Sequence, residues 1–264
     1  MTARSRQRVK KFLGRLAEAT GIYAHNFRSK MVIVTFHRVN DWMVEDPITC
    51  GTGRFEEFCR FFKRHFHVVP LSEQIAGCRE GRNMGGTLSI TFDDGYRDNM
   101  EIAAPILKRL ELPAAFFVAT GFIGTDYTPP WDRQLTRQAG WMDWDQVREL
   151  RKMGFEIGAH TNRHVDLATL DSESVRAELV ECRETLMREL AEPVTLFAYP
   201  FGGREHISED SRRIVQEVGF ECCLAAYGGT NPPITDPFHL NRVTIGGWFA
   251  TPNQLGFEIV MKRA

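Results

Sequence analysis

The stretch TLSITFDDG at residues 87–95 joins a run of β-branched and apolar side chains to two adjacent aspartates and a glycine. The run 87–92 predicts a buried strand, because such side chains suit a pleated surface. Two like charges this close are costly unless a cation or a shared proton lies between them. A helix N-cap needs only one aspartate. The pair Asp93 and Asp94 therefore favours a chemical site at the end of this strand.

Similar runs recur along the chain, at 31–37, 67–71, 114–120, 155–159, 195–199, 220–227 and 239–245. Between them, apolar residues at helical spacing predict helices at 54–65, 97–110, 144–153, 171–190 and 208–218. This alternation is typical of a parallel α/β sheet. Seven or eight strands predict closure into a barrel, in which functional groups lie at the ends of the strands.

The composition is that of an ordinary globular protein, with 264 residues, 43% of them hydrophobic and 25% charged. This length predicts one substantial core and one domain. The formal net charge of -1 argues against nucleic acid as a partner. The six cysteines show no paired C-x-x-C spacing, so we expect reduced packing residues, in agreement with a cytoplasmic location.

The first fifteen residues are strongly basic and contain no acid: Arg4, Arg6, Arg8, Lys10, Lys11 and Arg15. With the apolar residues interleaved, they predict a basic amphipathic helix within 1–29, followed by a folded domain at 30–264. This segment lacks the apolar run of a signal peptide, and no stretch approaches the roughly 20 apolar residues of a membrane span. Two alternatives stay open for this helix. Either the protein is cytoplasmic and the helix rests on the anionic inner face of the membrane, or the helix is solvated and packs on the domain.

The motif HTNRH at 160–164 follows the predicted strand 155–159 and places two imidazoles four residues apart. From a tight turn, both can reach one point. Two histidines and one carboxylate form a common catalytic zinc set, which keeps one position open for water. Alone, the H-x-x-x-H spacing is a weak signal. Together with Asp93 and Asp94 at another strand end of the same barrel, it predicts a metal site.

Three motifs, TFDDG at 91–95, HTNRH at 160–164 and FAYPFG at 197–202, resemble the leading motifs of the polysaccharide deacetylases. This is the NodB-like family, or carbohydrate esterase family 4, and the likeness extends over about residues 30–245. The resemblance implies a distorted (β/α)7-type barrel. It also implies metal-dependent hydrolysis of N-acetyl groups on a glycan.

The resemblance further implies a role for each matching residue. Asp93 would be the general base that accepts a proton from the attacking water, and Asp94 would bind the metal with His160 and His164. The backbone N–H of Phe201 would help to hold the oxyanion. Zinc is the expected metal, with cobalt, nickel or manganese able to occupy such a site.

The chain departs from the family pattern in two places. Where many members carry an arginine that orients the catalytic aspartate, this sequence has Ala198, followed by Tyr199. Arg242 is our candidate for that contact, and a structural salt bridge is the alternative. The late L-x-H motif, which supplies the general acid, is missing, since no histidine follows His239.

His37 offers a replacement for the missing acid. It ends the first predicted strand in VTFHRV, and in a closed barrel the first strand lies beside the last. A branch of the family that acts on poly-N-acetylglucosamine exopolysaccharides carries its acid histidine in an early Y-H motif, which TFHRV resembles. We therefore predict that His37 is the general acid, the alternative being a hydrogen-bonded histidine at a strand end.

The segment 121–143 is rich in Gly, Pro, Trp and Thr and predicts a loop insertion over one face. Within it, Trp131 is the candidate for stacking on a sugar ring, whereas Trp144 is expected to pack. We expect His206 to be structural or solvent-exposed and Asp166 to be a cap. The predicted contacts on the substrate side are Phe201, Tyr199, Arg242 and Trp131.

These observations predict an N-deacetylase that acts on N-acetylglucosamine-type residues of a bacterial exopolysaccharide or its lipid-linked precursor. An O-acetyl esterase of the same fold is the nearest enzymatic alternative. A non-catalytic carbohydrate-binding scaffold is a further alternative, motivated by the missing arginine and the relocated acid. The intact aspartate and histidine pairs argue against a scaffold.

Overall fold

The computed structural model describes residues 9–10, 13–14, 22–44, 46–135 and 137–261. Most of the basic helix expected within 1–29 lies outside these residues, including Arg4, Arg6, Arg8, Lys11 and Arg15. Its described end contains α2 (Ile22–Phe27), which packs against the C-terminal helix α9 (Pro252–Met261). Lys10 Nζ lies 2.9 Å from Glu258 Oε1 of α9. These contacts join this part of the N-terminal region to the domain.

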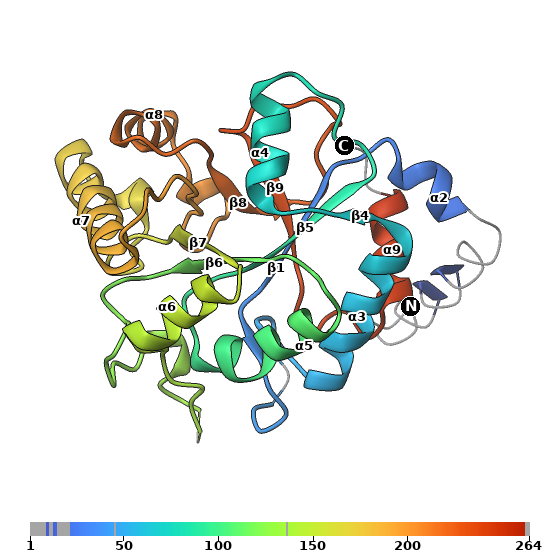
Figure 1. Cartoon of the computed structure of the whole chain (residues 1–264), viewed down its shortest axis with the longest axis horizontal. Coiled ribbons are helices and arrows are strands. Elements are labelled where there is room, and N and C mark those ends of the chain that lie inside the picture. The colour runs from blue at the N-terminus through green and yellow to red at the C-terminus, as the bar shows by residue number, and fades with distance from the viewer. Residues whose placement is uncertain (1–8, 11–12, 15–21, 45, 136, 262–264) are drawn as a thin grey trace.

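A parallel sheet forms the centre of the described chain (Figure 1). Its strands are β1 (Val32–Phe36), β4 (His67–Val68), β5 (Thr87–Phe92), β6 (Ala115–Val118), β7 (Glu156–Ala159), β8 (Leu224–Gly228) and β9 (Leu240–Thr244). The order is β7-β6-β5-β1-β9-β8, with β4 beside β5. Val34 pairs with Val243, so the first strand lies beside the last, as the sequence predicted. The short strands β2 (Arg38–Val39) and β3 (Thr49–Cys50) form a separate pair.

The run 195–199, expected to be a strand, joins the two ends of the sheet through single bridges instead. Phe197 pairs with Ala159 at the end of β7, and Ala198 pairs with Leu224 at the start of β8. Pro200 and the positive φ of Phe201, 60°, then end the extended conformation. The barrel is therefore distorted at this point, and the third sequence motif occupies the distortion.

Helices surround the sheet (Figure 1). They are α3 (Thr52–His65), α4 (Leu71–Arg79), α5 (Ala104–Arg109), α6 (Trp144–Lys152), α7 (Ser172–Leu190) and α8 (Glu209–Val218), with the π-turn η1 (Asn99–Ala103) before α5. Short 3₁₀ turns are η2 (Pro130–Asp132), η3 (Leu167–Thr169) and η4 (Arg204–His206). Helices α4 and α9 were not predicted, because their buried faces include Gln and Gly residues, which weaken the apolar spacing. No helix of the described residues is long and apolar enough to cross a membrane.

Stacked phenylalanines fill the space between the sheet and the outer helices. Phe92 of β5 stacks on Phe116 of β6 at 4.7 Å between ring centroids, and Phe36 of β1 meets Phe55 of α3 edge-on at 5.0 Å. All six cysteines are buried and free, as expected for packing residues. This packing holds the ends of β1 and β5 in place, where His37 and the aspartate pair follow.

Candidate active site

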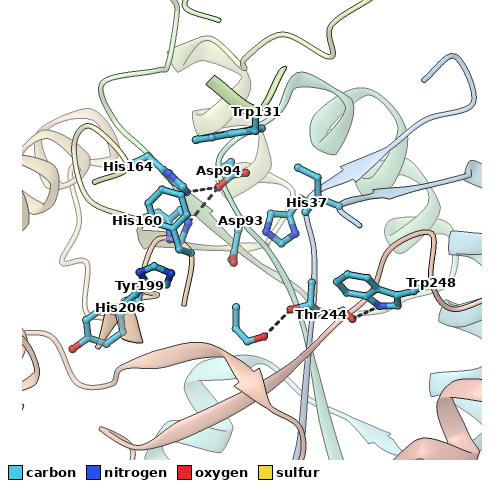
Figure 2. Close-up of a pocket in the computed structure, with 13 residues that line it drawn as sticks. His37, Asp93, Asp94, Trp131, His160, His164, Tyr199, His206, Thr244 and Trp248 are labelled. Carbon is cyan, nitrogen blue, oxygen red and sulfur yellow. Dashed lines mark hydrogen bonds and ion pairs between the residues drawn. The ribbon is translucent and has the colours of Figure 1, made fainter. Parts of the chain in front are cut away.

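A pocket of about 480 Å³ lies where the carboxyl ends of the strands meet (Figure 2). His37 follows β1, Asp93 and Asp94 follow β5, and His160 and His164 follow β7. Because parallel strands present these ends on the same side of a barrel, residues far apart in the sequence meet there. The structure thus brings all five predicted catalytic and metal-binding residues to one pocket.

Backbone conformation explains how two consecutive aspartates face one pocket. Side chains of adjacent residues in a strand point to opposite faces. Asp94, directly after β5, has a φ of 78°, which turns the chain out of the extended conformation. Thr161, His164 and Phe201 also have positive φ values, so four of the six such non-glycine residues in the described chain lie in the motifs. Clustered strain of this kind is typical of functional sites.

The side chains of Asp94, His160 and His164 converge on one point. Their ligand atoms lie within 4.8 Å of one another. Asp94 Oδ1 lies 3.3 Å from His160 Nε2 and 3.1 Å from His164 Nε2, and it accepts no well-aligned hydrogen bond from a described residue. Buried oxygen and nitrogen atoms that approach without bonding fit a shared cation, since each offers a lone pair. The donor set therefore suits a divalent metal.

The orientation of His160 supports this assignment. Its Nδ1 lies 2.8 Å from the carbonyl oxygen of Ala198. A carbonyl only accepts, so Nδ1 carries the proton and the Nε2 lone pair faces Asp94. Ala198 stands where many family members have an arginine, and its backbone carbonyl oxygen accepts the hydrogen bond from His160.

A buried glutamate holds the histidine motif in its turn. Glu178 of α7 is 2% exposed, and its Oε2 accepts the backbone N–H groups of Asn162 at 3.1 Å and Arg163 at 2.9 Å. These two residues lie between His160 and His164. The carboxylate thus satisfies backbone donors that the left-handed turn leaves without secondary-structure partners.

Arg242 of β9 binds Asp93 through the two terminal nitrogens of its guanidinium group. Nη1 donates to Oδ1 at 2.8 Å and Nη2 to Oδ2 at 2.6 Å, while Nε donates to the Ala225 carbonyl at 2.8 Å. Burial raises the pKa of the Asp93 carboxyl, but Arg242 and then His160 lower it, and the net pKa lies below its ordinary value. Arg242 is buried behind Asp93 and outside the pocket lining, so it contacts the predicted base rather than the substrate.

His37 lines the pocket and is partly exposed, whereas its Nδ1 is buried without a partner among the described residues. Asn99 Nδ2 donates to the His37 carbonyl oxygen at 2.6 Å and holds the backbone. Burial lowers the pKa of the imidazole more than Asp94 and Asp93 raise it. A neutral His37 must therefore take up a proton before it can donate one.

Phe201 lines the pocket. Its side chain is 48% exposed, and the ring centroid lies 4.9 Å from that of His164. No described residue accepts a hydrogen bond from its backbone N–H. Tyr199 lines the wall, but its hydroxyl lies 3.4 Å from Ser211 Oγ and 3.7 Å from Cys223 Sγ. That hydroxyl is therefore engaged within the protein.

Trp131, from the long insertion, covers the histidine side of the pocket (Figure 2). Its ring centroid lies 4.8 Å from that of His164, and its Nε1 donates to the Tyr96 hydroxyl at 2.9 Å. The neighbouring Asp132 is paired with the buried Arg38 at 2.5 Å. The insertion is thus fixed over the site. Trp144 packs on the core, as expected.

Five residues of the pocket lining escaped sequence reasoning, and two of them, His206 and Trp248, carry rings. His206 lines the pocket, and its Nδ1 lies 2.6 Å from Asp166 Oδ2. Asp166 also accepts the Ala168 N–H as the cap of η3, the role that was expected. Trp248, in the turn after β9, is the second. The available signal for each was its distance in the sequence from a predicted site residue. His206 comes four residues after FAYPFG, and Trp248 comes six residues after Arg242.

A sequence profile described as polysaccharide deacetylase matches residues 80–223, more than half of the chain. The chain belongs to the polysaccharide deacetylase family. Residues 91–95, 160–164 and 197–202, which carried the resemblance in the sequence, all lie within the matched region.

Curated relatives of this deacetylase include the Bacillus subtilis protein YxkH, which is 25% identical over 219 residues, 82% of this chain and 72% of that one. The poly-beta-1,6-N-acetyl-D-glucosamine N-deacetylase of Staphylococcus aureus is 21% identical over 203 residues. That match covers 73% of this chain and 66% of the relative. The exopolysaccharide branch of the family, predicted from the TFHRV and FAYP motifs, is thus among the relatives.

Solved structures agree with the fold. IcaB from Ammonifex degensii superposes with a TM-score of 0.70 at 21% identity and covers 89% of this deacetylase and 98% of its own chain. Streptococcus pyogenes deacetylase PplD, in complex with acetate, gives a TM-score of 0.69 at 18% identity, with coverages of 86% and 96%. The predictions of family, deacetylase class and distorted barrel are confirmed. Deacetylases of this family depend on a metal, for which Asp94, His160 and His164 offer a site.

Proposed function

We propose that the protein removes N-acetyl groups from N-acetylglucosamine-type residues of a bacterial exopolysaccharide or its lipid-linked precursor. One observation carries the proposal: a carboxylate held by a buried arginine, Asp93, lies beside a group of side chains suited to a cation. A general base next to a metal site is the arrangement that hydrolysis of an unreactive amide needs.

Asp94, His160 and His164 are the residues that would hold the metal, and we propose zinc. A zinc ion in such a site acts as a Lewis acid, which polarises a carbonyl and makes water easier to deprotonate. The set of one carboxylate and two imidazoles also accepts cobalt, nickel or manganese.

Three groups around this site have separate roles in the reaction. Asp93 accepts a proton from the water that attacks the acetyl carbonyl. The Phe201 N–H donates to the oxygen that becomes negative in the tetrahedral state. His37, once protonated, gives its proton to the amine as the C–N bond breaks. Acetic acid, which ionises to acetate and a proton, and a free amino sugar are the products, and the proton on Asp93 returns through solvent to His37, so atoms and charge balance over one turnover.

For the substrate, two observations favour a glycan. Trp131 and Phe201 place aromatic faces beside His164 and, through it, beside the metal site. The named relative from Staphylococcus aureus is an N-deacetylase of a β-1,6-linked N-acetylglucosamine polymer.

We also propose a cytoplasmic location at the inner membrane face, supported by the six basic residues among the first fifteen. Fractionation of cells into soluble and membrane fractions, before and after a high-salt wash, tests that location.

The decisive experiment measures acetate release from N-acetylglucosamine oligomers by purified protein, before chelation, after chelation and after zinc is added back. We expect release that chelation abolishes and zinc restores. The surface variant Asp145→Asn is the matched control and should behave as the wild type, because Asp145 is 91% exposed and lies outside the pocket. Activity on O-acetylated sugars alone would favour the esterase. Glycan binding without any acetate release would favour the scaffold.

A further inference from the structure

Trp248 is an exposed aromatic residue in the wall of the same pocket. The residue is 43% exposed, although tryptophan is large and apolar. In Figure 2 it lies on the far side of His37 from His160 and His164. An exposed ring of this size within a binding pocket calls for an explanation by the ligand.

The turn that carries Trp248 is fixed by close backbone packing. A Cβ at Gly246 would lie 1.9 Å from the Pro47 carbonyl oxygen, so only glycine allows this approach. The Gly247 N–H donates to the Asp46 carbonyl at 2.7 Å. Asp46 in turn is paired with the buried Arg38 at 2.6 Å. The turn after β9 and the loop before β3 therefore form one rigid wall.

The indole itself is oriented within this wall. Trp248 Nε1 donates to the Thr244 carbonyl at 3.1 Å, and Gln254 Nε2 donates to the Trp248 carbonyl at 3.3 Å. The polar atom of the ring is thus satisfied inside the protein. The rest of the ring is apolar and partly exposed, so it can contact a ligand, and a fixed ring loses little conformational entropy on binding.

The position of the ring separates it from the reacting sugar. The acetyl group must lie near Asp93 and the metal site, where Trp131 and Phe201 already contact His164. Trp248 stands across His37, at the other side of the pocket. The apolar face of a pyranose stacks on an aromatic ring, so a sugar on Trp248 is one linked to the reacting sugar.

We propose that Trp248 forms a subsite for the sugar adjacent to the one that is deacetylated, so that the protein recognises linked sugars rather than a single N-acetylglucosamine. This inference rests on the proposed function and deepens it. It makes Trp248 a specificity residue that acts through binding, and it makes chain length a determinant of the rate.

The test compares kcat/KM for β-1,6-linked N-acetylglucosamine oligomers of one to five sugars in the wild type, Trp248→Ala and Trp248→Phe. In Trp248→Ala we expect the ratio of pentamer to monomer to fall about tenfold, mainly through KM, which corresponds to about 1.4 kcal/mol. Trp248→Phe keeps a ring and should restore most of the ratio. Tyr127→Ala is the control, because Tyr127 is 45% exposed but outside the pocket lining.

A loss in Trp248→Ala that is equal for all chain lengths, or no loss, would overturn the subsite. If the wild type releases no acetate from any oligomer, the proposed function fails instead. The subsite is then judged by calorimetric affinity for the pentamer and the monomer. A fall of about tenfold in their ratio in Trp248→Ala supports it, and an unchanged ratio overturns it.

Discussion

Asp93 and Asp94 are neighbours in the chain, similarly buried, and at the end of the same strand, yet the protein treats their carboxylates in different ways. Each oxygen of Asp93 accepts a hydrogen bond from Arg242. Asp94 Oδ1 lies close to two imidazole nitrogens but accepts no well-aligned hydrogen bond from a described residue. The difference comes from β9, which reaches only the first aspartate.

This comparison teaches how one dipeptide serves two roles. A carboxylate that is fixed and kept ionised by an arginine is prepared to accept a proton in a defined direction. A carboxylate with an uncommitted buried oxygen beside two imidazoles is prepared to bind a cation. Separate partners, rather than separate residue types, divide base from ligand. Each prediction below perturbs one partner and asks whether only one role changes.

The largest effect is expected when the aspartates themselves are changed. Asp93→Asn should lower kcat about 10³-fold, because an amide cannot accept the proton, while the zinc content after gel filtration stays near that of the wild type. Asp94→Asn should lose both zinc and activity. Metal analysis and acetate release on the same samples check this. Loss of zinc in Asp93→Asn would contradict the division of roles.

A smaller loss is expected from His37→Ala. This change leaves in place both Arg242, the partner of Asp93, and the two histidines beside Asp94. Removal of the general acid should lower kcat about 10²-fold on N-acetyl substrates, and less on O-acetyl substrates, because an amine leaves poorly without a proton. Bound zinc should not change. His239→Ala is the matched control, since His239 is half-exposed and paired with Asp236 outside the active-site pocket. Equal losses on both substrate types would show that His37 is not the acid.

Sequence reasoning reached the parts of this site that strand order controls. The runs 87–92 and 155–159 were recognisable by composition, and their following motifs meet because parallel strands end on one side. The pairing of β1 with β9 was expected from barrel closure, and it brings Arg242 to Asp93 and His37 to the same pocket. The functional roles of these side chains stay predictions.

Features that depend on loop conformation were not predicted. His206 reaches the pocket because the chain turns at Phe201 and Gly202, where both φ values are positive. The turn that carries Trp248 is held there by the close approach of Gly246 to Pro47 and by the hydrogen bond from Gly247 to Asp46, about two hundred residues away along the chain. The run 195–199, expected to be a strand, forms single bridges instead, and these too join residues that lie far apart in the chain. Local propensity carries no information on such long-range contacts.

Arg242→Lys tests the base side of the comparison more gently. Lysine keeps the positive charge but cannot donate two parallel hydrogen bonds, so Asp93 should lose its orientation. We expect kcat to fall about tenfold, with zinc affinity unchanged. Arg183→Lys is the control, because Arg183 donates to the Val194 and Val218 carbonyls away from the site. If Arg242→Lys binds zinc more weakly, the two carboxylates are coupled and the comparison fails.

Glu178→Gln tests the metal side, and here the smallest change in turnover is expected. Glutamine keeps the shape of Glu178 but weakens its bonds to the N–H groups of Asn162 and Arg163, which hold the turn between the two histidines. Zinc affinity should therefore fall about tenfold, and the free energy of unfolding should drop by about 1–2 kcal/mol. At saturating zinc, kcat should stay within about twofold of the wild type, since Asp93 and Arg242 are untouched. Chelator competition, denaturant unfolding and acetate release measure the three quantities.

Glu181→Gln is the control, because Glu181 is an exposed glutamate on the same helix. A large loss of kcat at saturating zinc would mean that the histidine turn also positions the base, and the separation of the two aspartates would be incomplete.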